Sequence, residues 1–184
     1  MINILYGGAV AGLLALIPLY AVDRYQISTL GSGTLLTAEG VTVVVLSSLA
    51  TMALRRTGYR LPLYVGSAFI ALGFAGLAIH PLGLSPYAWL AVTAAVVGLG
   101  TGVSSPASRN AGLQLAPDQS PALAALRTTG RQVGQILAVS ITTTIMAQSA
   151  SPGDLEAKVF IAFAVILIAC LPVIALVPEH RGSW

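Results

Sequence analysis

Three arginines lie in a short loop between two long apolar runs, and this arrangement limits what the chain can fold into. The loop is Leu54-Arg55-Arg56-Thr57-Gly58-Tyr59-Arg60-Leu61. Upstream, residues 34–54 carry a single charge, on Glu39, and downstream residues 61–79 carry none. A helix of about 20 apolar residues crosses the hydrocarbon core of a bilayer, which is about 30 Å thick. The pattern therefore predicts two membrane-spanning helices joined by a basic hairpin.

The composition excludes a soluble globular protein. Of the 184 residues, 56% are hydrophobic and 8% are charged, and the mean hydropathy is +0.86. Soluble domains contain about 25% charged residues, so this chain has too few to cover a surface that faces water. The net charge of +3 comes from basic residues in loops and at helix ends, which indicates topology and not a nucleic-acid partner. Cys170 is the single cysteine, which excludes an intramolecular disulfide.

Six apolar runs follow one another, and we expect each to be a membrane-spanning helix of one all-helical domain over residues 1–184. Polar connectors separate the runs; the longest is 109–121, and the connector 149–158 holds Asp154 and Glu156. Met1-Ile2-Asn3 lacks the cationic residues of a cleaved signal, so we expect the first run to be retained. The expected spans are residues 4–22, 34–54, 61–79, 87–108, 121–148 and 159–177.

Basic residues are distributed unequally between the two sides of this six-span topology. Arg24 and Lys158 lie in the first and fifth connectors. The other seven lie at the termini, in the second and fourth connectors, or in the first turns of the fifth run, which is long enough to begin at or beyond the headgroup level. Cytoplasmic loops carry an excess of Lys and Arg, so both termini are expected to be cytoplasmic. The seven are Arg55, Arg56, Arg60, Arg109, Arg127, Arg131 and Arg181.

Several short motifs lie in register with the six runs. They are Pro18-x-Tyr20, Tyr25-Gln26, Gly33, Arg56-x-Gly58-x-Arg60, Gly66, Gly98-x-Gly100-x-Gly102-x-x-x-Pro106 and Arg131-Gln132-Val133-Gly134. Over nearly the whole chain, this order resembles the C-terminal six-helix half of a major facilitator superfamily transporter, most closely the fourteen-span drug:proton antiporters. The hairpin motif of that superfamily is usually Gly-x-x-x-Asp-Arg-x-Gly-x-Arg, and here Thr51 and Arg55 stand at its Gly and Asp positions.

The resemblance implies proton-coupled export of small amphipathic or cationic compounds across a bacterial-type inner membrane, without a cofactor or a metal. Alternating access in this superfamily uses two six-helix halves that rock against each other, and this chain provides one. The chain is then a fragment of a longer transporter, one partner of a second six-helix chain, or half of a homodimer. A structural or interaction half-bundle that does not transport is the alternative.

Glu39 is the only carboxylate expected deep within a span. An ionisable group at that depth costs about 2.5–3.5 kcal/mol on insertion scales, so it should face the bundle interior or a water-filled cavity. It is either a proton-titrating or cation-binding group, or a structural carboxylate hydrogen-bonded to a neighbouring helix. Arg127 and Arg131 are four residues apart and share one helix face. They are expected to meet an anionic substrate or a carboxylate at the inner mouth, or to bind lipid phosphates or lock two helices together.

Other residues with an expected role are amides, small residues and aromatic residues. Gln132 and Gln135 are expected to face a cavity or to form hydrogen bonds between helices. Pro106 is expected to kink or end the fourth span. Close helix packing is expected at Gly98, Gly100, Gly102, Gly130 and Gly134. Aromatic anchors at the outer interface are expected at Tyr20, Tyr25, Tyr87 and Trp89.

An intramembrane hydrolase is a different class with six spans, but its motifs are missing. A rhomboid-type serine protease needs Gly-x-Ser-Gly in one span and a histidine in another. The nearest string, Gly102-Val103-Ser104-Ser105, lacks the final glycine, and His80 and His180 lie outside the expected spans. The zinc motif His-Glu-x-x-His is absent, and no pair of carboxylates lies within the expected spans. The sequence therefore predicts that the protein is not an enzyme.

Overall fold

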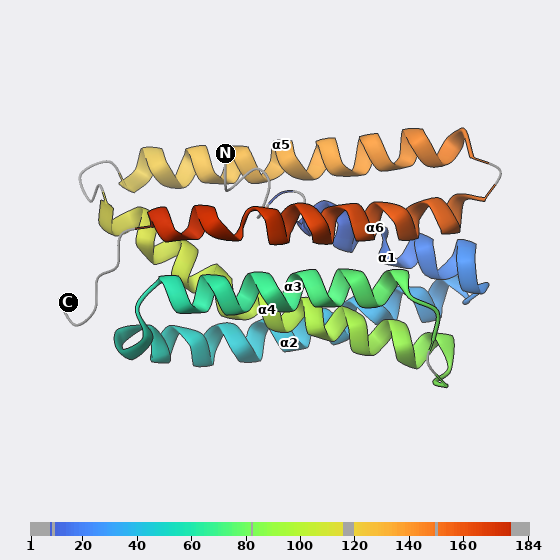
Figure 1. The fold of residues 1–184 in the computed structure, drawn as a ribbon, viewed down its shortest axis with the longest axis horizontal. Helices are drawn as coiled ribbons and strands as arrows, with labels where there is room; N and C mark the ends of the chain where they lie inside the picture. Colours follow the sequence, from blue (N-terminus) through green and yellow to red (C-terminus); the bar gives the residue numbers. More distant parts are fainter. Residues whose placement is uncertain (1–7, 9, 82, 116–119, 150, 178–184) are drawn as a thin grey trace.

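The computed structural model is a bundle of helices that lie side by side along its long axis (Figure 1). It describes residues 8, 10–81, 83–115, 120–149 and 151–177, and within these it has six α-helices, one 3-10 helix and no strand. The elements are α1 (Val10–Tyr25), α2 (Thr29–Thr57), α3 (Arg60–Ala78), α4 (Pro86–Leu115), α5 (Ser120–Ala147), α6 (Pro152–Ala169) and the 3-10 helix η3 (Leu171–Leu176). The all-helical class expected from the sequence is confirmed.

Four of the described segments are long and apolar enough to cross a membrane. They are Thr29–Leu54, Arg60–Ala78, Pro86–Ala111 and Pro152–Ala175. Within the described residues, α1 and α5 are not in this set: α1 has only 16 described residues, and α5 is the least apolar of the α-helices. The structure therefore supports an integral membrane protein with apolar helices.

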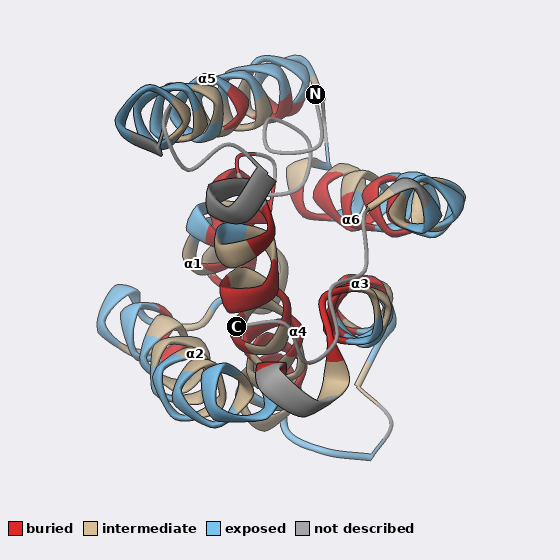
Figure 2. Ribbon diagram, turned by 90° about the vertical axis from the view of Figure 1, so that its left-hand side faces the viewer, coloured by how far each residue is buried: buried red, intermediate tan, exposed pale blue. Residues whose placement is uncertain are grey.

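α1 and α4 lie at the centre of the bundle, and their residues are mostly buried or half-buried (Figure 2). α4 packs along both α2 and α3, and α3 also packs along α6. Aromatic rings join α1, α3 and α6: Phe160 lies edge-on to Tyr20 at 5.2 Å and is stacked with Phe74 at 5.7 Å between ring centroids. α2 and α5 lie at the edge of the bundle with largely exposed faces (Figure 2).

Glycines on opposite faces of α4 allow its two neighbours to approach closely. A Cβ atom added at Gly98 would lie 2.7 Å from the carbonyl oxygen of Glu39, so this face of α4 touches the backbone of α2. A Cβ atom at Gly100 would collide with the carbonyl oxygen of Gly66 in α3. Close backbone approach is a main source of packing energy between helices in lipid. α1 and α5 approach in the same way, since a Cβ at Gly12 would lie 2.8 Å from Cβ of Ala138.

The basic hairpin is tight because a glycine adopts a left-handed backbone conformation. Gly58 has φ of 70°, and its N–H donates to the carbonyl of Leu54 over 3.0 Å at the end of α2. Glycine has no Cβ atom that would clash in this conformation. Arg60 begins α3 and donates from Nε to the carbonyl of Val177 over 2.7 Å, which ties α3 to the end of η3. The side chain of Arg56 lies outside the described part of the structure.

The fourth helix is longer than the sequence predicts. Pro106 was expected to kink or end it; the helix does not end there, because α4 continues through Pro106 to Leu115. Proline removes one helical N–H, and neighbouring helices in a bundle stabilise the helix around such a gap. Residues 109–115, expected in a connector, therefore belong to α4, and Arg109 is carried on this helix.

The sixth helix begins earlier and ends earlier than expected. α6 starts at Pro152, so the expected polar connector 149–158 is mostly helical. Proline suits the first turn of a helix because its missing N–H has no helical partner there. At the other end α6 stops at Ala169 and gives way to η3, which begins next to Pro172. The expected span 159–177 is therefore not one continuous α-helix.

Candidate functional site

A cavity of about 400 Å³ lies between α1, α2, α4 and α5. It brings together three residues predicted from the sequence, Glu39, Arg127 and Arg131, which come from α2 and α5. Hydroxyl and amide groups from α2 and α4 also line the cavity, although most of its wall is apolar. The other lining residues are Val10, Ala11, Leu14, Val43, Ser47, Thr51, Thr101, Ser105, Pro106, Ser108, Arg109 and Asn110.

Glu39 lies at one end of the line of cavity residues on α2. The cavity continues along α2 from Glu39 to Thr51, which are 12 residues or about 18 Å apart along the helix. The Glu39 side chain is half-buried, and it forms no ion pair within the described part of the chain. Arg131 is nevertheless near enough to act electrostatically on its carboxyl group. Glu39 is thus a carboxylate on the cavity wall that none of the described arginine side chains neutralises by direct contact.

Three arginines line the cavity on α4 and α5. Arg127 is half-buried and donates from Nη2 to the hydroxyl oxygen of Ser108 over 3.2 Å, which links α5 to α4. Arg109 and Arg131 are close enough to repel it electrostatically. Arg109 was not among the predicted site residues, because it was expected in a connector. With one carboxylate and three guanidinium groups, the cavity carries an excess of positive charge.

The two glutamines of α5 are not among the described residues that line this cavity. Gln132 is exposed, and neither Gln132 nor Gln135 is among the described lining residues. A Cβ atom at Gly12 would lie 2.9 Å from the carbonyl oxygen of Gln135, so the backbone of α5 at this position packs against α1. Gly134 lies in the same contact, 2.6 Å from a Cβ added at Gly8.

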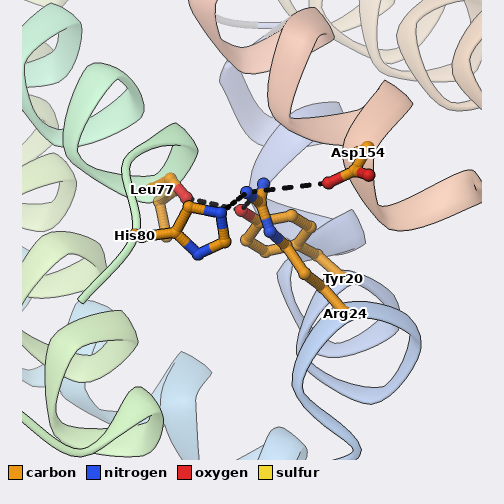
Figure 3. Close-up of polar contacts among 5 residues, drawn as sticks. All are labelled: Tyr20, Arg24, Leu77, His80 and Asp154. Atoms are coloured by element: carbon orange, nitrogen blue, oxygen red, sulfur yellow. Dashed lines mark hydrogen bonds and ion pairs between the residues drawn. The ribbon is translucent and has the colours of Figure 1, made fainter.

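A second polar cluster joins α1, α6 and the loop after α3 (Figure 3). Tyr20 donates to the carbonyl of Leu77 over 2.6 Å, and Arg24 donates from Nη1 to the hydroxyl oxygen of Tyr20 over 2.7 Å. Nη2 of Arg24 lies 3.2 Å from Nε2 of His80 and 3.7 Å from a carboxylate oxygen of Asp154. Tyr20 is fully buried, so its predicted place in an aromatic belt facing lipid is wrong.

Glu156 is a buried carboxylate that the sequence analysis missed. Its side chain is 0% exposed, and neither of its oxygens has a hydrogen-bond partner in the described part of the structure. The sequence places it in the polar connector expected at residues 149–158. The spacing along the sequence could have predicted its burial. Glu156 lies three residues after Gly153 and four before Phe160, so it shares a helix face with two residues that pack inward.

Groups that could hold a metal ion are not found in the described part of the chain. No three His, Cys, Asp or Glu side chains gather there in a suitable cluster. The candidate site among the described residues is the cavity with its carboxylate and three arginines.

Apolar helices long enough to cross a bilayer, packed around a charged cavity, define a polytopic membrane protein with a site inside its bundle. The chain belongs to the Major Facilitator Superfamily, whose family profile matches residues 1–139. Members of this superfamily are secondary transporters and not enzymes, so the chain is assigned to secondary transport. Searches of curated proteins and of solved structures found no match.

Proposed function

We propose that this chain is one six-helix half of a proton-coupled secondary transporter that exports small amphipathic cations across a bacterial-type inner membrane. In this proposal α1 and α5 cross the membrane with the other four helices, and both termini are cytoplasmic. The observation that carries the proposal is the position of Glu39. It lies on the wall of a cavity inside the bundle, and no described residue neutralises it in an ion pair.

Glu39 is suited to exchange one cation for another. An ionisable group within a membrane is costly and marks an ion or proton pathway when it faces a cavity. A proton and a cationic substrate compete for the same carboxylate, so binding of one favours release of the other. This competition is the simplest physical basis for antiport at a single site. Arg131, which acts on Glu39 electrostatically, then favours release of the bound cation.

A second half is needed to complete the cavity. α2 and α5 flank it and keep large apolar side chains exposed, among them Val44 at 66%, Leu126 at 71% and Ile136 at 63%. Only 6% of the span segment of α2 is buried in this structure, against 56% for α3. A second six-helix chain, or a second copy of this one, would cover α2 and α5 and form the opposite wall, as alternating access requires.

Transport by the protein as isolated from cells, with any six-helix partner that co-purifies, tests this function. The complex is reconstituted into proteoliposomes with an acidic lumen, and uptake of a fluorescent quaternary ammonium compound is measured. We expect uptake that needs the pH gradient and stops when a protonophore is added. Uptake that persists with the protonophore contradicts proton coupling, and the absence of uptake contradicts the cationic substrate.

The three arginines favour a second candidate, an amphipathic anion, as the substrate. Guanidinium groups bind carboxylates and sulfonates through charge-assisted hydrogen bonds, and Arg109, Arg127 and Arg131 all line the cavity. If the substrate is an anion, Arg131→Gln should weaken its binding about tenfold, which corresponds to about 1.4 kcal/mol. If the substrate is a cation, the same variant should bind it as well as or better than the unaltered protein.

Competition measurements with an alkyl sulfonate and an alkyl ammonium compound separate the two candidates. Lys158→Gln is the matched control, since Lys158 is an exposed cation on α6 and does not line the cavity. A tenfold loss of sulfonate binding in Arg131→Gln, but not in Lys158→Gln, would replace the first candidate by the second.

A further inference from the structure

We propose that Glu156 is a proton-binding site at the interface between α1 and α6, separate from the central cavity. Glu156 does not line that cavity, and none of the cavity residues takes part in the cluster around Arg24. The inference therefore stands whether or not Glu39 couples transport to protons.

Two contacts on either side of Glu156 place it against α1. A Cβ atom added at Gly153 would lie 2.8 Å from Cβ of Arg24, so α6 touches α1 at that level. One turn beyond Glu156, the ring of Phe160 meets the ring of Tyr20. Residues three and four apart share a helix face, so Glu156 lies on the same face as Gly153 and Phe160, between the levels of Arg24 and Tyr20.

The surroundings of Glu156 suit a neutral carboxylic acid. The side chain is fully buried, and both of its oxygens are without a hydrogen-bond partner among the described residues. Removing an ionised carboxylate from water without a partner costs several kcal/mol, whereas a protonated carboxyl group carries no charge. The arrangement is that of a carboxyl group with its proton bound.

Arg24 is the group that would form an ion pair with the ionised carboxylate of Glu156. Its Nη atoms contact Tyr20, His80 and Asp154, while its Nε is buried and unpartnered in the described part of the structure. Loss of the proton from Glu156 to water would leave a negative charge on the face of α6 that packs against α1 at Arg24. An ion pair between them would draw Arg24 away from Asp154, which is 65% exposed and is the weaker partner at 3.7 Å.

Other charged or titratable groups near Glu156 come from α1, from α6 and from the loop after α3. Asp23 is near enough to act on Glu156 electrostatically. From α5, which also packs on α6, the described residues nearest the turn before α6 are Gln148 and Ser149, which are neutral. The groups near Glu156 are Tyr20, Asp23, Arg24 and Tyr25 of α1, Asp154 and Lys158 of α6, and His80.

Infrared difference spectroscopy of the reconstituted protein tests the bound proton directly. Between acidic and alkaline buffer, the carbonyl stretch of a buried carboxylic acid should disappear in the unaltered protein. We expect the band of Glu156 to be missing at all pH values in Glu156→Gln, apart from any band that Glu39 contributes, and to be retained in Asp154→Asn, the matched control with an exposed carboxylate on the same helix. The same band in Glu156→Gln would overturn the proposal.

Arg24→Gln is a second variant that keeps Glu156 in place. It removes the cation that stabilises the ionised carboxylate, so the infrared band should persist to a pH higher by about one unit, the shift that 1.4 kcal/mol of lost interaction produces. An unchanged or lower pH of disappearance would contradict the pairing with Arg24. This variant gives a result even if Glu156→Gln does not fold.

Discussion

Replacing Gly100 by valine is expected to disrupt the contact between α3 and α4 and to destabilise the bundle by about 3 kcal/mol, the upper end of the usual cost of overpacking. A Cβ atom at this position would collide with the carbonyl oxygen of Gly66 and would lie 2.7 Å from the backbone nitrogen of Ile70. Both obstacles are backbone atoms of α3, which cannot move aside as a flexible side chain can. The loss of stability is measured by thermal unfolding of the variant and the unaltered protein in detergent.

Gly33→Val is the matched control for this variant. Gly33 lies in α2, and a Cβ atom there would meet nothing within 4 Å. An exposed substitution of this kind usually changes stability by less than about 0.5 kcal/mol. Equal melting temperatures for Gly100→Val and Gly33→Val would show that α3 and α4 do not approach as closely as the structure places them.

Glu39→Gln is expected to abolish the pH dependence of transport and to lower cation binding at least about tenfold. Glutamine keeps the shape of the side chain but neither carries a charge nor exchanges a proton. Losing one charged contact worth about 1.4 kcal/mol corresponds to a tenfold change in binding. Binding and transport of a quaternary ammonium compound are measured across a series of pH values in proteoliposomes.

Ser47→Ala controls for general damage to the cavity. Ser47 lines the same cavity from the same helix, eight residues from Glu39, and is not ionisable. We expect this variant to keep the pH dependence of the unaltered protein. Unchanged pH dependence in a folded Glu39→Gln variant would leave Glu39 with a structural role only.

The existence and order of the helices could be predicted because apolar length and proline or glycine breaks are properties of the local sequence. Their ends were less predictable. Of the two roles expected for Pro106, ending α4 is wrong, because packing against α2 and α3 stabilises a helix with one missing hydrogen bond. α6 begins at Pro152, seven residues before the expected start of the span at residue 159. Glu156 therefore belongs to a helix that packs on α1.

The site was only partly predictable because sequence gives depth along a helix but not rotation about its axis. The position of Glu39 within an apolar run predicted a group facing inward, and the structure places it on a cavity with Arg127 and Arg131. The same reasoning placed Tyr20 toward lipid, and the structure buries it against Phe160. The positions of the Glu39 and Tyr20 side chains depend on which helices pack against α2 and α1. The local sequence does not determine this.

Cysteine labelling on either side of α3 tests the central claim that this chain crosses a membrane with its arginine hairpin inside the cell. Thr57→Cys and Leu84→Cys are introduced separately into a Cys170→Ser background, since Cys170 is the single native cysteine. α3 has 19 residues and is about 28 Å long, enough to separate the two positions across a bilayer core. In intact cells, an impermeant maleimide should label position 84 and leave position 57 unlabelled until the membrane is opened. Labelling of position 57 from outside, or of both positions from one side, would contradict the account.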